Sequence, residues 1–131
     1  MVLPVLFAVL VGTVEFGILL MSSQGVSAAA NIGAREAALP SSDLASVTAA
    51  VHTALEGYIW DNPPVPGVVE VRVLVNGTLD TGTLLANAAS GDIVTVIVDC
   101  PMDSAAPDAL SIFGISLAGR ELTSTFVTRR E

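Results

Sequence analysis

The 131-residue chain contains no lysine, one cysteine and one histidine. The single cysteine, Cys100, excludes an intrachain disulfide and a cysteine-rich metal site. The single histidine, His52, leaves a serine–histidine–aspartate triad formally open, but no serine stands in a nucleophile-elbow pattern. We therefore expect no enzyme activity, no cofactor, no metal site and no small-molecule substrate.

Basic residues are scarce, since five arginines face 13 acids and the net charge is −8. An acidic domain repels phosphate backbones, which argues against a nucleic-acid partner. The chain also has no basic cluster that could hold anionic lipid headgroups. Aromatic residues make up 5% of the sequence, and small residues dominate. Such a composition suits a modest sheet covered by one helix.

The longest uncharged stretches lie at the N-terminus. The first 34 residues contain no Lys or Arg and one acid, Glu15, which separates the apolar residues 1–14 from the apolar residues 16–21. A helix needs about 20 mostly apolar residues to cross a bilayer. The N-terminal segment is therefore a candidate membrane anchor.

Three interpretations of this segment compete. A secretory signal peptide would find small residues for cleavage at 27–30, but it requires a basic start, and Glu15 interrupts its apolar region. A buried core helix would be apolar all round, and the remaining domain is too small to enclose it. A single-pass anchor fits best, and we predict it.

The anchor helix should continue beyond the membrane, because no strong breaker precedes Pro40 and the segment is rich in alanine. We predict one helix over residues 1–39, about 60 Å long at the α-helical rise. Its outer half should stand clear of the bilayer as a stalk of small residues, which allow helices to approach closely. Such a stalk is suited to packing on other helices.

Glu15 is the unusual residue of the anchor, because a carboxyl group in hydrocarbon is costly. One interpretation is a protonated or snorkelling carboxyl that local water tolerates. The other is a polar contact with another subunit or an assembly protein, which would set the axial register of the helix. We favour the second, because the apolar run has no basic partner of its own.

Three short motifs carry a resemblance to a known family. Pro4 occupies the proline of a V-x-P motif, and Glu15, Phe16 and Gly17 form an E-F-G motif. Gly33, Ala34 and Arg35 match the end of a small-residue stretch. With these motifs the chain resembles the TadE-like family of the tight-adherence (Tad, or Flp) pilus. Residues 122–131 are also similar to family members. Asn31 and Ile32 depart from the pattern, because they stand where the family often has Arg followed by an acid.

The resemblance implies a pseudopilin or minor pilin. Such a protein lies in the bacterial inner membrane, with its N-terminus in the cytoplasm and its globular part outside. Its partners would be other pilin-like subunits and pilus assembly proteins, contacted through the N-terminal helix. In the family pattern the first glutamate would fall three positions before Met1, and a basic leader with its prepilin-peptidase site would precede that position.

Residues 40–131 should form a small soluble α+β domain. Apolar residues at helical spacing predict a second helix over about 43–59, with a loop at 60–67. Alternating or continuous runs of β-branched residues predict strands at 68–75, 92–99 and 121–130. The simplest assembly is a three-stranded antiparallel meander with the second helix on one face.

The remaining segments give weaker expectations. Asn76-Gly77 reads as a turn, and residues 76–91 should form a mobile loop or a turn of helix. The loop at 101–119 should pack on the core through four apolar residues: Leu110, Ile112, Phe113 and Leu117. The acids of this region should be solvated rather than bind a cation, because their spacing does not fit an EF-hand: Asp99, Asp103 and Asp108. Cys100 should be a buried, inert thiol, and His52 a half-buried surface residue.

Two classes of function follow. The leading one is a structural or assembly component of an envelope fibre, in which the helix inserts among pilin-type helices. The rival is a small binding domain of the bacterial envelope, either tethered by the helix or released by signal peptidase. The rival requires a convergent set of polar groups, and the sequence shows none.

Overall fold

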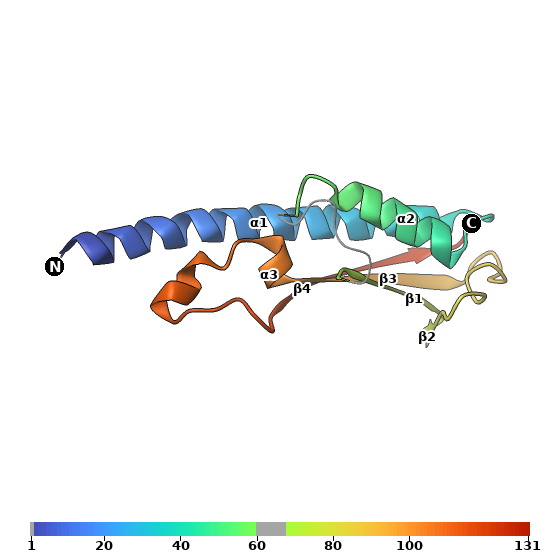
Figure 1. The fold of residues 1–131 in the computed structure, drawn as a ribbon. Coiled ribbons are helices and arrows are strands. Elements are labelled where there is room, and N and C mark those ends of the chain that lie inside the picture. Colours follow the sequence, from blue (N-terminus) through green and yellow to red (C-terminus); the bar gives the residue numbers. More distant parts are fainter. Residues whose placement is uncertain (1, 60–67) are drawn as a thin grey trace.

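One unbroken helix, α1 (Val2–Ala38), runs from the N-terminus to the far end of the domain (Figure 1). The computed structural model describes residues 2–59 and 68–131. The other elements, in chain order, are α2 (Leu44–Leu55), β1 (Glu70–Val75), β2 (Thr78–Leu79), β3 (Ile93–Pro101), α3 (Met102–Ala105), the 3-10 helix η1 (Ala109–Phe113) and β4 (Glu121–Arg129). The predicted α+β class and the long N-terminal helix are confirmed. The loop predicted at 60–67 lies outside the described residues.

Helix α2 begins and ends at local signals. Asp43 is its N-cap, and its carboxylate accepts from the Ser46 backbone N–H at 2.8 Å while the Ser46 hydroxyl accepts from the Asp43 N–H at 3.1 Å. This reciprocal pair is a capping box. The helix ends at Leu55, four residues before the predicted end, because Gly57 adopts a left-handed conformation with φ +86°.

The sheet has four antiparallel strands in the order β2-β1-β3-β4. The meander of β1, β3 and β4 was predicted, and Val96 at its centre pairs with Val73 on one side and Phe126 on the other. The prediction of three strands missed β2. Asn76 and Gly77, at φ 51° and 82°, form the two-residue turn that joins β1 to β2, and Asn-Gly favours this tight hairpin.

The segment that follows β2 is ordered by a buried carboxylate, that of Asp80. It accepts backbone hydrogen bonds from Gly82 at 2.7 Å and from Leu84 and Leu85 at 2.9 Å each. Burial acts to raise the pKa of Asp80, but these N–H groups outweigh it and hold the pKa below its usual value. Within residues 76–91, the Asn87 N–H also donates to the Thr83 carbonyl at 3.2 Å, which is the hydrogen bond of a single helical turn.

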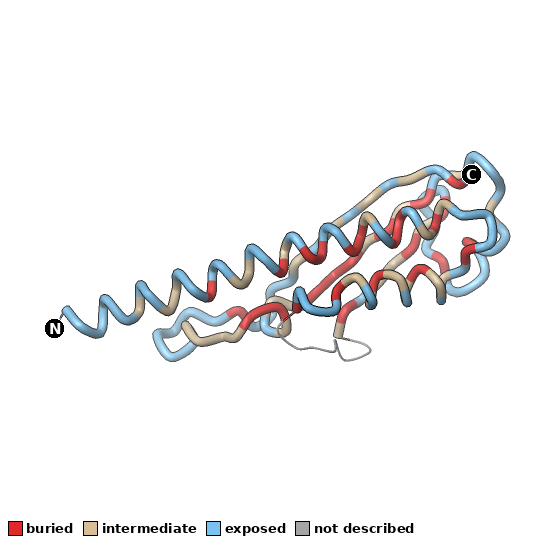
Figure 2. The backbone as a smooth tube through the Cα atoms, turned by 90° about the horizontal axis from the view of Figure 1, so that it is seen from above, coloured by how far each residue is buried: buried red, intermediate tan, exposed pale blue. Residues whose placement is uncertain are grey.

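The core lies between the sheet and a layer made of α2 and the second half of α1 (Figures 1 and 2). Helix α1 contacts β3 and β4 directly, and α2 packs mainly on α1 rather than on the sheet. The small-residue half of α1 therefore packs on its own domain, a contact that the sequence did not predict, and the placement of α2 alone over the sheet is wrong. The small side chains of α1 pack within the chain itself.

Two loop predictions also need correction. Of the four apolar residues expected to pack the 101–119 loop on the core, Leu117 is buried, whereas Ile112 is 85% exposed. Asp99 is not a solvated loop acid. It is buried, its carboxylate forms an ion pair with Arg72, and it accepts the Thr123 hydroxyl at 2.6 Å. An acid on a central strand finds these partners on the neighbouring strands.

Candidate functional site: the N-terminal helix

One face of α1 is turned toward the rest of the chain along nearly its whole length. The residues that are less exposed than their neighbours recur every three or four positions, as one helix face requires: Ala8, Val11, Gly12, Glu15, Ile18, Leu19, Ser22, Gly25, Val26, Ala29, Ala30, Gly33, Ala34 and Ala37. Three of the predicted motif residues, Glu15, Gly33 and Ala34, lie on this face. The others, namely Pro4, Phe16, Gly17 and Arg35, are exposed.

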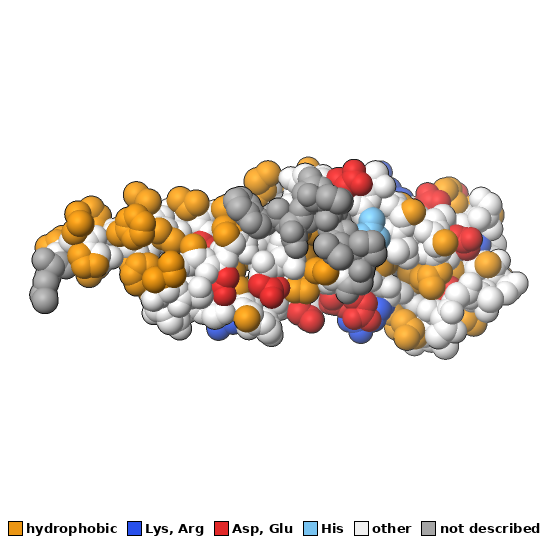
Figure 3. All heavy atoms as spheres, viewed as in Figure 1, with side chains coloured by type: hydrophobic (Ala, Val, Ile, Leu, Met, Phe, Trp, Pro, Cys, Tyr) orange, Lys and Arg blue, Asp and Glu red, His pale blue; other side chains and the backbone are white. Residues whose placement is uncertain are grey.

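The first half of α1 exposes large apolar side chains on its remaining surface (Figure 3). Helix α1 is long and apolar enough to cross a membrane, and 6% of its most apolar 18-residue window is buried. A core helix of a soluble protein would be largely enclosed. The helix is therefore compatible with a single-pass membrane protein.

Glu15 is the exception in this half, since its residue exposure is 3%. Its Oε2 accepts the backbone N–H of Leu110, the second residue of η1, at 2.9 Å. Its Oε1 is buried and has no hydrogen-bond partner among the described residues. The carboxyl group borders a groove of about 260 Å³ whose other walls are Phe7, Leu10, Val11, Val14, Pro107 and Ala109. Neither interpretation of Glu15 from the sequence included this partner within the chain.

Ser22 lies two turns further along the same face and is also buried. Its hydroxyl lies 2.7 Å from the carbonyl oxygen of Ala105 and 2.9 Å from that of Tyr58. Together with Glu15, it holds the segment that contains α3 and η1 against α1. A Ser on a helix surface carries no sequence signal for such a contact, and its role was not predicted.

Two glycines set how closely α1 approaches its neighbours. A Cβ atom on Gly33 would lie 2.6 Å from Val51 Cγ2, and one on Gly25 would lie 2.4 Å from Tyr58 Cβ. Both distances are too short for carbon atoms, so these positions require glycine. Gly17, in contrast, has nothing within 4 Å of the corresponding position. The recurrence of small residues at helical spacing was the signal for this contact.

The C-terminus closes the far end of α1 through Arg130, whose importance the sequence did not indicate. Arg130 is buried, and its guanidinium donates to the carbonyl oxygens of Pro40 at 2.7 Å and Ala37 at 3.4 Å, and to the Ser42 hydroxyl at 3.3 Å. A cation that satisfies the last carbonyls of a helix is favourable.

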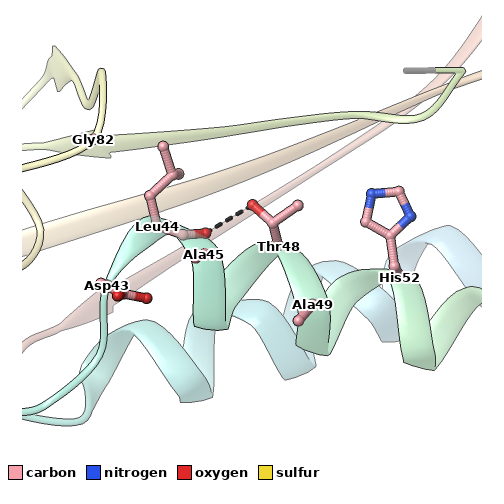
Figure 4. Close-up of a pocket in the computed structure, with 7 residues that line it drawn as sticks. All are labelled: Asp43, Leu44, Ala45, Thr48, Ala49, His52 and Gly82. Atoms are coloured by element: carbon pink, nitrogen blue, oxygen red, sulfur yellow. Dashed lines mark hydrogen bonds between the residues drawn. The ribbon is translucent and has the colours of Figure 1, made fainter. Parts of the chain in front are cut away.

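A shallow depression beside α2 is the other concave surface to consider (Figure 4). Its side chains from α2 include Leu44, Thr48 and His52, which are spaced one turn apart and point from the same side of the helix. His52 is half-buried, as predicted. Thr48 donates its hydroxyl proton to the Leu44 carbonyl at 2.7 Å, and Asp43 is engaged in the capping box. Most of its lining is small or apolar, and among the described residues that line it His52 is the titratable side chain for which no hydrogen bond is formed.

Cys100 is a buried thiol, as predicted. It is fully enclosed on β3, and burial, with a smaller effect from Asp103, raises its pKa to about 11. A thiol that stays protonated at neutral pH is a poor nucleophile. Within residues 2–59 and 68–131 no three His, Cys, Asp or Glu side chains come together as metal ligands.

Comparison with known proteins bears on the first quarter of the chain. The family model described as TadE-like protein matches residues 1–35, a segment that includes all of the motif residues named above. Neither the curated proteins nor the solved structures contain a significant match to the chain. The matched segment covers the apolar half of α1, Glu15 and the start of the close contact with α2. The resemblance deduced from the sequence is confirmed for this segment, residues 1–35, which match the TadE-like family model.

Proposed function

We propose that the chain is a pseudopilin or minor pilin with a structural or assembly role in a tight-adherence pilus or a related secretion system. The observation that carries the proposal is the TadE-like match over residues 1–35, a segment that forms one helix with large apolar side chains exposed around most of its first half. In this proposal residues 1–39 are the anchor and stalk helix and residues 40–131 are the soluble domain. The work of the protein is packing rather than catalysis.

The partners in this proposal are the membrane, other pilin-like subunits and pilus assembly proteins, which contact the exposed half of α1. Glu15 supports a specific contact, because its Oε1 is buried and receives no hydrogen bond from residues 2–59 and 68–131. An unsatisfied buried polar atom costs about 1–3 kcal/mol. A donor from a neighbouring subunit that enters the groove beside Glu15 would remove this cost and set the axial register between helices.

Substitution of Glu15 tests the contact. Glu15→Leu should insert into the membrane at least as well as the parent, because a carboxyl group in hydrocarbon is costly, but it should fail to co-purify with the pilus complex. Glu15→Gln should be milder, since an amide still accepts the Leu110 N–H. Assembly of the Leu variant at the parent level would show that Glu15 sets no register and that the carboxyl is merely tolerated.

The proposed location is the bacterial inner membrane, with the domain outside the cytoplasm. Asn87 is exposed and belongs to the segment between β2 and β3, which lies at the end of the domain opposite the apolar half of α1 (Figure 1). A cysteine there should react with a membrane-impermeant maleimide in cells with a permeabilised outer membrane. The buried Cys100 should not react and serves as the internal control. If the cysteine of Asn87→Cys reacts only after the cells are lysed, the proposed orientation is wrong.

The rival proposal, a small domain released by signal peptidase, has less support. Its cleavage site would fall at residues 27–30, within α1, and would remove Val26 from the core. The N-terminal sequence of the purified protein tests this directly. Retention of residues 2–21 supports the pilus proposal, and a new terminus near residues 29–31 supports release.

A further inference from the structure

The segment between α3 and β4 does not lie over the sheet but extends along the apolar half of α1 (Figure 1). Leu110 lies against Gly12, where a Cβ atom would be 3.6 Å from Leu110 Cδ1. Phe113 and Ile115 share a groove with Pro4, Ala8 and Gly12. The packed domain contacts α1 from about Ser22 onward, so the segment reaches about 15 Å further along the helix axis, from Ser22 to Gly12.

This segment shows the reverse of the usual pattern for a surface loop. Its apolar side chains remain exposed, although Phe113 and Ile115 also border the groove on α1: Ile112 is 85% exposed, Ile115 58% and Phe113 43%. No charged residue occurs in residues 109–119, and Asp108 and Arg120 flank this uncharged stretch. An exposed apolar patch marks an interaction surface.

The serine hydroxyls of the segment are exposed, but they are hydrogen-bonded within the segment itself. The Ser111 hydroxyl donates to the Asp108 carbonyl at 2.6 Å, and the Ser116 hydroxyl donates to the Asp108 carboxylate at 2.7 Å. The backbone N–H groups of Gly114 and Ile115 donate to carbonyls within the segment at 3.0 and 3.2 Å. That of Leu110 donates to Glu15. In a bilayer, backbone polar groups must be satisfied within the protein, and the N–H groups of Leu110, Gly114 and Ile115 meet that requirement.

We propose that residues 109–115, termed here the η1 loop, enter the lipid bilayer beside α1 and form a second membrane contact in the leaflet on the side of the domain. The proposal rests on the membrane anchoring in the proposed function, because the η1 loop lies alongside the half of α1 that has the length and hydropathy of a span. A helix that enters a bilayer carries with it whatever is packed on it. The occupant of the exposed face is therefore the acyl-chain region of that leaflet.

The arrangement gives Glu15 a second task, independent of any other subunit. Its Oε2 accepts the N–H at the start of η1, which would otherwise be unpaired in lipid. The domain is then held against the membrane surface at two points. Asp108 and Arg120, the first charges on either side of the uncharged stretch, mark where the chain returns to the headgroups.

The test uses the full chain in vesicles of phosphatidylcholine and phosphatidylglycerol, with part of the phosphatidylcholine carrying a doxyl group on its acyl chains. Single cysteines at Ile112, at Leu10 and at Thr125 are labelled with the fluorophore nitrobenzoxadiazole. Leu10 is the control within the span, and Thr125, exposed on β4, is the control outside the membrane. Cys100 stays unlabelled because its thiol is buried.

The label at Ile112 should be quenched by the doxyl lipids to at least half the extent found at Leu10, and the label at Thr125 should not be quenched. Quenching at Leu10 with none at Ile112 would overturn the proposal and leave the anchor intact. Fluorescence of the label at Ile112 that changes with protein concentration but not with doxyl lipid would show that a second protein copy covers this face. That result would also overturn the proposal. No quenching at Leu10 would instead refute the anchor of the proposed function.

Glu15→Gln and Glu15→Leu, each combined with Ile112→Cys, provide a second measurement. The Gln variant keeps an acceptor for Leu110 and should retain the quenching at Ile112. The Leu variant removes it and should lower the quenching at Ile112 while that at Leu10 in the same background is unchanged. Equal quenching in both variants would show that Glu15 does not hold the loop in place.

Discussion

The two halves of α1 belong to one continuous helix and are both poor in charge, yet they face different surroundings. The first half carries Leu, Val and Phe side chains that remain largely exposed. The second half carries Ala, Gly and Ser residues that are buried against α2 and the sheet. Large flexible side chains suit a fluid apolar solvent, because such a solvent adapts to any shape. Small side chains suit a fixed protein partner, because backbones can then approach closely. Side-chain size, rather than hydropathy, separates the two halves.

The largest expected effect comes from a charge in the first half. Leu10→Asp should weaken membrane insertion by about 3–4 kcal/mol, since Leu favours and Asp opposes insertion near the centre of a span. The fraction of protein recovered with membranes measures the effect. Ala28→Asp, on the exposed side of the second half, is the matched control and should insert normally. If both variants lose membrane insertion equally, the two halves of α1 do not differ in their surroundings as described.

The reciprocal change adds bulk to the second half. Gly33→Val should lower the free energy of unfolding by about 2–3 kcal/mol, because Val51 already occupies the space that the new side chain needs. Urea denaturation in detergent, followed by far-ultraviolet circular dichroism, measures it. Gly17→Val adds the same group where nothing lies within 4 Å and should change stability by less than about 0.5 kcal/mol. A Gly33 variant as stable as the parent would mean that α1 and α2 are not closely packed.

The end of the second half should depend on Arg130. Arg130→Met should cost about 2 kcal/mol of stability, because the carbonyl oxygens of Pro40 and Ala37 lose a charged donor in a buried place. Arg129→Met, at an exposed position, should have little effect. The same denaturation experiment compares the two variants. If they are alike, Arg130 does not hold the end of the helix.

The smallest expected effect lies away from α1 and tests the ordering of the 80–89 segment. Asp80→Asn should cost about 1–2 kcal/mol at neutral pH, because an amide cannot replace both carboxylate oxygens toward three N–H groups. The pKa of Asp80 is lowered in the folded state, so its stabilisation is complete above the unfolded value near 3.8 and is lost as the pH falls through the folded value.

The difference between Asp80→Asn and the parent should therefore shrink below about pH 4. Unfolding measured from neutral to acidic pH follows it, and Asp103→Asn, at an exposed carboxylate, is the control. A difference that stays constant or grows toward low pH would contradict the assigned role of the carboxylate.

Much of the fold follows from local signals. The absence of a breaker before Pro40 predicted α1, and alternating or continuous runs of β-branched residues predicted β1, β3 and β4. The missed strand β2 is short, and its Asn-Gly turn was recognised only as a turn. The early end of α2 at Gly57 was missed because the apolar pattern continues to Ile59 after the helix has ended. The spacing of apolar residues indicates which side chains are buried, and buried side chains can continue beyond the last residue of the helix.

For the candidate site, too, the sequence showed local features but not long-range contacts. Its motif residues were visible in the sequence, because the positions of Pro4, Glu15 and Gly33 form a recognisable pattern. Their contacts were not visible, since the partner of Glu15 lies 95 positions further along the chain and the partners of Arg130 about 90 positions earlier. Most of these partners are backbone groups, and the sequence does not mark which distant backbone group will form such a contact.

The sequence by itself determined the length of α1, its apolar half, the three main strands and the TadE-like character of residues 1–35, because helix propensity, periodicity and motif spacing are local properties. The tertiary structure alone decided that the small-residue half of α1 packs on its own domain, that the η1 loop lies beside the apolar half, and that Glu15 receives a backbone N–H. These features depend on which surfaces fit one another once the chain has folded. Close fit between distant segments is a property of shape in three dimensions, and no single segment contains it.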